Sequence, residues 1–118
     1  MGPGGKVEGK EVRAVCENVA HVYPQRRWHD GVYVVGDDAA LRSLGRAVKQ
    51  ALSEGRGVCE TFTADGEGYD IVVIRLRDPG LWDLLRLPYV GDCAADRREE
   101  AIGPRELLAR LRRAVRED

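Results

Sequence analysis

The alternation of apolar and polar residues predicts one helix more clearly than any other element. Within residues 38–54, apolar side chains recur every three or four positions and would share one helix face, while the opposite face is mostly polar and charged. Asp37 or Asp38 supplies an N-cap, and Gly55 follows the last turn, where a left-handed residue ends many helices. We expect this helix to lie on a sheet through its apolar residues, which are Leu41, Leu44, Val48 and Leu52.

Three shorter segments have the composition of β-strands. Residues 31–36 are β-branched and aromatic and lie between glycines, whereas residues 57–64 alternate more weakly. Residues 69–77 are apolar on both faces, with Ile71 and Val73 opposite the other apolar side chains, which is typical of the middle strand of a sheet. We therefore expect a small three-stranded sheet of these segments in split β-α-β order, with the helix on one face.

Further helices are predicted outside this sheet. A short helix at 79–86 would place Trp82 and Leu85 inward, and a C-terminal helix at 104–116 would carry a proline in its first turn. Near the N-terminus, valines at helical spacing predict a helix at 9–22. The sequence EVRAVC within it also alternates like a strand, so both interpretations remain open there.

Composition limits the class of protein. The 118 residues fit one α+β domain at 9–118, preceded by a flexible, glycine-rich N-terminus at 1–8. With Lys+Arg 19 against Asp+Glu 20, net charge does not favour a nucleic-acid or acidic-membrane partner. No signal peptide and no apolar run of roughly 18 residues is found, so we expect a soluble, cytoplasmic protein. Without a CxxC pair, Cys16, Cys59 and Cys93 are expected to be reduced, with no bound metal or cofactor.

The sequence TADGEGYD at 63–70 places three carboxylates and two glycines together. Asp-Gly between two strands is typical of a type I′ hairpin turn. An EF-hand calcium loop requires a different spacing of oxygen ligands, and a phosphate loop requires a lysine and a following helix. We interpret the segment as a turn; the alternative is a small enzyme that uses His29, Asp65 and Glu67 for acid–base chemistry.

The sequence YPQRRWHDG is the candidate binding segment. Arg26 and Arg27 lie beside Trp28, and Tyr33 follows in the next strand. Aromatic and arginine side chains are enriched in protein interfaces, and the same combination can stack on and neutralise a nucleic-acid strand. The structural alternative is a solvated loop whose tryptophan covers the sheet edge.

The order VYVVGDDAALRSLGRAVKQAL, FTADGEGYDIVVIRL and LWDLLRLPY resembles small bacterial α+β domains, some of which are similar to immunity proteins of toxin systems. The resemblance spans about residues 31–90 and carries no catalytic residue, so it implies a binding role. We therefore expect a non-enzymatic protein-binding module of a bacterial cytoplasm, immunity-like or regulatory. It would form a homodimer or bind another protein through a sheet edge or the second sheet face. The small enzyme is the second hypothesis, and a weak nucleic-acid binder is the third.

Overall fold

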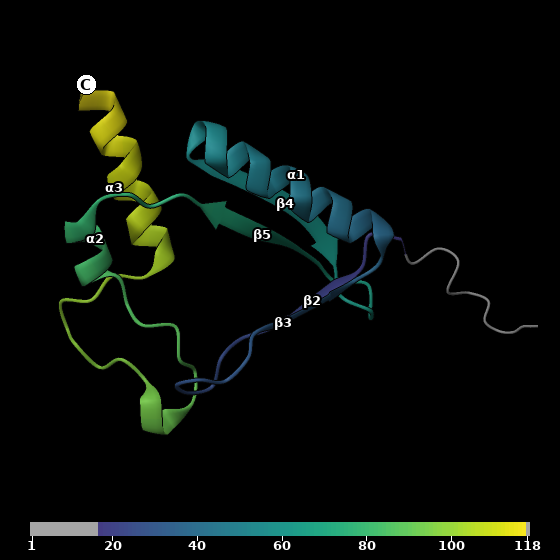
Figure 1. Ribbon diagram of the computed structural model, residues 1–118, viewed down its shortest axis with the longest axis horizontal. Coiled ribbons are helices and arrows are strands. Elements are labelled where there is room, and N and C mark those ends of the chain that lie inside the picture. The colour runs from purple at the N-terminus through teal and green to yellow at the C-terminus, as the bar shows by residue number, and fades with distance from the viewer. Residues whose placement is uncertain (1–16, 118) are drawn as a thin grey trace, which may run out of the picture. The chain divides into compact units, whose positions relative to one another are not determined.

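The computed structural model describes residues 17–117, with side chains described as far as Arg113. It confirms the α+β class. Two compact units are present: one contains the described residues up to Val22 together with Val34–Val73, and the other contains Tyr23–Tyr33 and the chain from Ile74 onward. The elements in chain order are β2 (Ala20–Tyr23), β3 (Tyr33–Gly36), α1 (Asp38–Glu54), β4 (Arg56–Phe62), β5 (Gly68–Ile74), α2 (Pro79–Leu84), a 3₁₀ turn (Asp92–Ala94) and α3 (Pro104–Glu117) (Figure 1).

Helix α1 has the predicted ends. The Asp37 side chain accepts a hydrogen bond from the Ala40 N–H at 2.9 Å and so caps the first turn. Gly55 has φ 97°, and its N–H donates to the Ala51 carbonyl at 2.8 Å. A left-handed residue at this position satisfies a carbonyl that the helix leaves unpaired, and glycine adopts that conformation without a steric penalty.

The buried face of α1 differs from the predicted one. Its buried residues are Ala40, Ala47 and Ala51, whereas Leu41, Val48 and Leu52 are 46%, 42% and 64% exposed and Leu44 is half-buried. Gly57 of β4 explains the difference, because a Cβ added there would lie 1.9 Å from the Ala47 carbonyl oxygen. The two backbones therefore approach too closely for leucine at the contact, and alanine takes its place.

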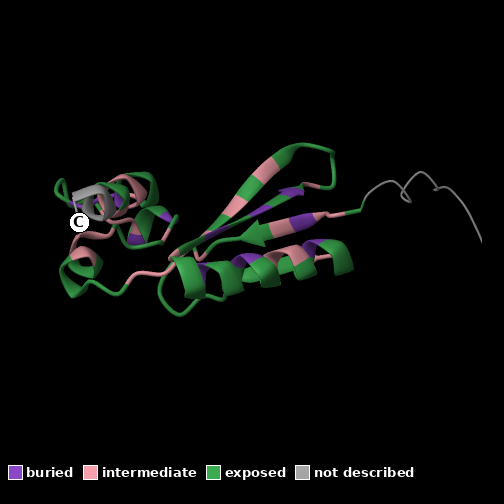
Figure 2. Cartoon of the chain, turned by 90° about the horizontal axis from the view of Figure 1, so that it is seen from above, coloured by how far each residue is buried: buried purple, intermediate pink, exposed green. Residues whose placement is uncertain are grey.

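Strands β4 and β5 form an antiparallel hairpin, and one face of this hairpin is covered. Along β4, buried and exposed residues alternate, and Gly57, Cys59 and Thr61 are the buried ones (Figure 2). On β5, Tyr69, Ile71 and Val73 are partly buried, but Val72 is 40% exposed. The alternation that is typical of a half-covered sheet is thus present, and the second face of β5 exposes Asp70 and Val72.

The predicted three-stranded sheet is wrong. In the described part of the chain, β3 pairs with β2 and β4 pairs with β5, as two antiparallel two-stranded sheets. An isolated parallel bridge joins Val19, just before β2, to Phe62 at the end of β4. The split β-α-β order would have required β3 to pair with the distant β5, whereas pairing with β2 closes a much shorter loop.

The predicted helix at 9–22 is wrong where the structure describes it. Residues 17–22 contain no helix, and β2 begins at Ala20. Asn18 has φ 70°, and its carbonyl accepts hydrogen bonds from the Phe62 N–H at 3.1 Å and the Thr61 hydroxyl at 2.6 Å. Asparagine tolerates the left-handed conformation, which a helix cannot contain. The rest of this prediction, and the flexible N-terminus at 1–8, lie outside the described residues.

The second unit contains two helices close to the predicted ranges. Helix α2 begins at Pro79 and is capped by the Asp78 side chain, and α3 begins at Pro104 as expected. A parallel bridge between Leu85 and Ile102 connects the segments that flank them. Trp82 was expected to face inward but is 56% exposed. Helix α2 has only six residues, and the indole N–H of Trp82 donates to the Leu76 carbonyl at 3.0 Å.

An ion pair fixes the loop between α2 and α3. Arg98 binds Asp96 with two hydrogen bonds, of 3.0 and 2.7 Å, and also donates to the Asp83 and Leu85 carbonyls. The Asp96 side chain is almost fully buried and accepts a further bond from the Leu87 N–H at 2.9 Å. The Arg98 guanidinium and the N–H groups of Leu87 and Arg98 hold the pKa of Asp96 well below its usual range.

Candidate functional site

Hairpin β2–β3 exposes apolar side chains on both of its faces. In β3, Tyr33 is 64%, Val34 43% and Val35 61% exposed, although neighbouring residues of a strand point to opposite faces. Val22 and Tyr23 of β2 are also exposed. Isolated exposed apolar residues are normal, but a contiguous group of them marks an interaction surface. We call these five residues the hairpin surface.

The loop between β2 and β3 is held by backbone hydrogen bonds. The N–H groups of Val90 and Gly91 donate to the carbonyls of Gln25 and Arg26 at 3.0 and 2.8 Å. A Cβ at Gly91 would lie 2.5 Å from the Arg26 carbonyl oxygen, so glycine permits this approach. Within the loop, His29 has φ 67°, and the Asp30 N–H donates to the Arg27 carbonyl. The loop therefore has a defined backbone.

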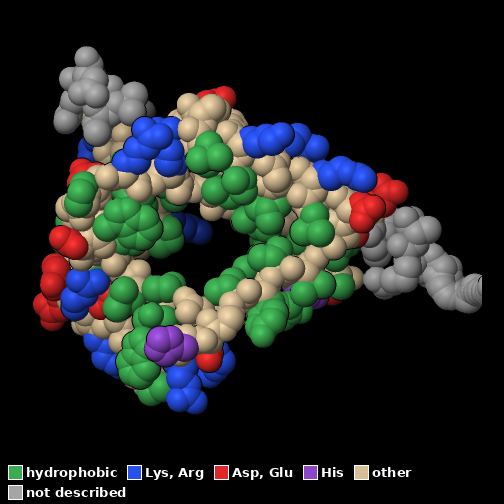
Figure 3. Space-filling view, viewed as in Figure 1, with side chains coloured by type: hydrophobic (Ala, Val, Ile, Leu, Met, Phe, Trp, Pro, Cys, Tyr) green, Lys and Arg blue, Asp and Glu red, His purple; other side chains and the backbone are tan. Residues whose placement is uncertain are grey.

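The predicted binding residues are all exposed on this hairpin and its loop. Arg26 and Arg27 are exposed, and Trp28 is 55% exposed with its ring edge-on to Tyr89 at a centroid distance of 6.3 Å. This contact fixes the indole without burying it. The described contact of Trp28 is with Tyr89 and not with a sheet edge, as the structural alternative had expected. Figure 3 shows that apolar side chains lie among charged ones on the visible surface.

The carboxylates of the β4–β5 turn have structural partners. The Asp65 carboxylate accepts a hydrogen bond from the Thr63 hydroxyl, which lowers the pKa of Asp65. The Thr63 N–H donates to the Glu67 carbonyl, and the Gly66 N–H donates to the Thr63 carbonyl, both at 2.9 Å. Only Gly66 has positive φ in this turn, so it is a three-residue loop with a left-handed glycine and not the predicted type I′ turn.

The histidine at this turn is His21 and not His29. The His21 Nε2 accepts a hydrogen bond from the Ala64 N–H at 2.9 Å, whereas His29 belongs to the other compact unit. Of the three residues of the enzyme hypothesis, the structure thus places only Asp65 and Glu67 in one turn. The spacing of 43 residues between His21 and Ala64 gives no local sequence signal, so this contact was not predictable.

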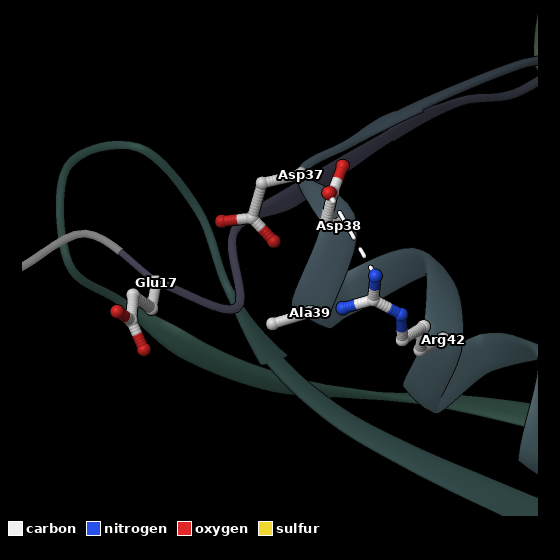
Figure 4. A pocket seen from close by; sticks show the side chains of 5 residues that line it. All are labelled: Glu17, Asp37, Asp38, Ala39 and Arg42. Carbon is white, nitrogen blue, oxygen red and sulfur yellow. Dashed lines mark ion pairs between the residues drawn. The ribbon is translucent and has the colours of Figure 1, made fainter.

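A hollow of about 450 Å³ lies at the N-terminus of α1 and is lined mainly by acidic residues (Figure 4). Asp37 uses one oxygen to cap α1 and the other to accept the Val19 N–H at 3.1 Å, and these bonds lower the pKa of its carboxyl group. Asp38 forms an exposed ion pair with Arg42 at 3.9 Å. The helix cap and this ion pair account for the acidic side chains of α1, so the hollow is not a convincing ligand site.

A second hollow, of about 330 Å³, lies on hairpin β4–β5 beside Phe62 and Tyr69. The Tyr69 hydroxyl donates to the Ala20 carbonyl at 2.5 Å, and burial, followed by the nearby Cys59, raises the pKa of this phenol. Tyr69 thus connects β5 to β2. No group of three metal-ligating side chains is found among the described residues, where Cys59 and Cys93 are both free thiols.

Comparison with known proteins adds no assignment: no family model, curated protein or solved structure matches the chain. The described residues also contain no helix with the length and apolar character needed to cross a membrane. The geometry of the site itself therefore carries the functional argument.

Proposed function

We propose that the chain is a non-enzymatic protein-binding module that engages its partner through hairpin β2–β3. The observation that supports this proposal is the exposure of apolar side chains on both faces of one hairpin, with Tyr33 and Val35 more than half exposed. An apolar surface of this kind is costly in water and is stabilised when a partner covers it. The resemblance to immunity-like bacterial domains favours the same class of function, in a bacterial cytoplasm.

Trp28 is the proposed anchor at the loop end of the hairpin. Its contact with Tyr89 and the backbone bonds of the loop limit its motion before binding, so less conformational entropy is lost on association. Tryptophan, tyrosine and arginine are also the residues most often found at the energetic centre of interfaces. Arg26 and Arg27 would then contact carboxylates of the partner around this anchor.

The two other hypotheses have weaker support. For the small enzyme, Asp65 is engaged by the Thr63 hydroxyl, and His29, the histidine of that hypothesis, belongs to the other unit. For the nucleic-acid binder, the exposed Arg26 and Arg27 are favourable, but the net charge of −1 gives no general attraction to phosphates. Neither is favoured by a feature as specific as the hairpin surface.

Affinity capture from a bacterial lysate with the immobilised chain tests this proposal. We expect a specific protein, or further copies of the chain, to be retained by the native chain and lost with the double variant Trp28→Ser, Tyr33→Ser. The control is Trp82→Ser, because Trp82 is as exposed as Trp28 but lies on α2. Circular dichroism verifies that both variants are folded. Retention that is equal for the double variant and the control would contradict the proposal.

A further inference from the structure

Among the described residues, no strand pairs with the outer edge of β3. The Asp37 N–H donates to the Val19 carbonyl, and backbone groups alternate in direction along a strand. Tyr33 and Val35 therefore point their N–H and C=O groups toward β2, whereas Val34 points its own away from it. Because β3 pairs only with β2 in the described chain, Val34 and the flanking Val32 and Gly36 form an open edge.

Apart from its short length of four residues, β3 lacks the features that protect edge strands. Natural edges carry lysine, proline or a bulge, or they are covered by another element. Residues 32–36, VYVVG, contain no charged residue and no proline, and Tyr33, Val34 and Val35 are all exposed. A strand that is apolar on both faces is normally found inside a sheet. The composition of β3 thus fits a strand with a neighbour on each side.

We infer that the neighbour is a second copy of this chain, which adds its β3 antiparallel to β3 about a two-fold axis at Val34. This inference rests on the proposed function and identifies the partner of the same hairpin. At the axis, Val34 and the partner's Val34 exchange backbone hydrogen bonds, and Val32 does the same with the partner's Gly36. The hairpins of the two copies then form one continuous sheet, and the open edge of each β3 is closed.

The side chains of β3 match in this register. Tyr33 lies opposite the partner's Val35, and an aromatic residue opposite a β-branched one is a favourable cross-strand pair. Val34 lies opposite the partner's Val34 on the other face. No charged residue occurs in the paired segment, so self-association brings no like charges together. This neutrality favours a second copy over a charged partner strand at the same edge.

The expected affinity is modest. One strand pair buries less than the ~1,200–2,000 Å² of a standard stable interface, so we expect a dissociation constant on the order of 10–100 µM. Sedimentation velocity between about 5 and 500 µM brackets that range, and the native chain should change from monomer to dimer across it. A chain that is monomeric throughout would overturn the inference, while lysate capture would still test the protein-binding proposal independently.

A matched pair of lysine variants tests the edge. Val34→Lys places two lysines opposite each other at the axis and should raise the dissociation constant about tenfold or more. Val72→Lys is the control, because Val72 is as exposed as Val34, 40% against 43%, but lies on β5 in the other sheet. It should leave association within about twofold of the native value. A dimer that is equally sensitive to both variants, or to neither, would overturn the assignment to β3.

Charge exchange tests the register. Val34→Lys and Val34→Glu should each self-associate weakly. In an equimolar mixture, the dissociation constant of the heterodimer should be about tenfold lower than that of either homodimer. This gain requires residue 34 to lie opposite residue 34 of the other copy, which occurs only when the two-fold axis passes through it. The gain should decrease in 1 M salt. A mixture that associates no better than its components would overturn the Val34-centred pairing, and circular dichroism of each variant verifies that the hairpin is intact.

Discussion

Hairpins β4–β5 and β2–β3 are both antiparallel and rich in valine, yet they differ in what covers them. Helix α1 lies on β4, and the residues buried between them are small: Ala47, Ala51 and Cys59 are each 1–2% exposed. On β2–β3 the large side chains of Tyr33 and Val35 remain more than half exposed. In these two hairpins, burial therefore follows from backbone approach and not from the size of the apolar side chain.

This difference separates a hairpin that stabilises the fold from the hairpin of the proposed function. A sheet covered through close-packed small residues has no room for rearrangement, because interiors are packed as densely as organic crystals. Hairpin β2–β3 buries Ala20 at one end, but its large apolar residues are exposed on both faces and gain little from folding and much from a partner. The proposed recognition surface is therefore β2–β3, whereas α1 with β4–β5 supplies stability.

The largest effect on stability is expected at Gly57. Gly57→Val would place its Cβ 1.9 Å from the backbone oxygen of Ala47, and backbone cannot move aside as a flexible side chain can. We expect the free energy of unfolding to fall by about 3 kcal/mol or more, measured by urea denaturation.

Gly45→Ala is the matched control for this variant. Apart from the backbone of α1 itself and the two chain neighbours, no atom lies within 4 Å of a Cβ added at Gly45, which is an exposed position inside α1. Alanine is the better helix former, so this variant should gain about 0.5–1 kcal/mol. If Gly57→Val were as stable as the native chain, α1 would not approach β4 as closely as described, and the contrast between the hairpins would fail.

The next largest effect is expected at Asn18, where β2 joins β4. Its side-chain Nδ2 donates to the Glu60 carbonyl at 2.8 Å, and its φ of 70° disfavours other side chains. Asn18→Ala loses the bond and strains the backbone, so we expect a loss of about 1–2 kcal/mol in urea denaturation. Asn18→Gly removes the same bond without the strain and should lose less. The reverse order of these two variants would contradict this account.

Tyr69→Phe should cost about 1 kcal/mol, because it removes the hydroxyl that donates to the Ala20 carbonyl. The native phenol also gives a pH signature. In the folded chain, the pKa of the Tyr69 phenol is raised above its ordinary value of 10.0. The phenol therefore contributes its full stabilisation below pH 10.0, and this contribution is lost as the pH rises through the folded pKa. Thermal melting between pH 8 and 11 should therefore show a steeper decrease for the native chain than for Tyr69→Phe. Parallel decreases would indicate that Tyr69 does not connect β5 to β2.

Features of this chain that depend on residues close together in the sequence were predicted correctly, and features that depend on residues far apart in the sequence were not. The ends of α1 depend on Asp37 and Gly55 beside the helix, and both were predictable. The face of α1 depends on Gly57 beneath Ala47, and the partner of β3 depends on β2, so neither could be found from local periodicity. For the candidate site, polar neighbours indicated that Arg26 and Trp28 would be exposed. The exposed valines of β3 were missed because apolar strands are normally buried.

The smallest effect is expected at Val35, and it tests the comparison most directly. Val35→Thr keeps the shape and the strand preference of the side chain, and the residue is 61% exposed, so its free energy of unfolding should change by less than about 0.5 kcal/mol. Cys59→Ser introduces a hydroxyl of similar kind at a position that is 1% exposed, where a loss of about 1–3 kcal/mol is expected. Urea denaturation well below the dimer dissociation constant compares the two variants in the monomer. A loss above about 1.5 kcal/mol for Val35→Thr would mean that the hairpin surface is buried within the folded monomer, and recognition through β2–β3 would then require the hairpin to be released first.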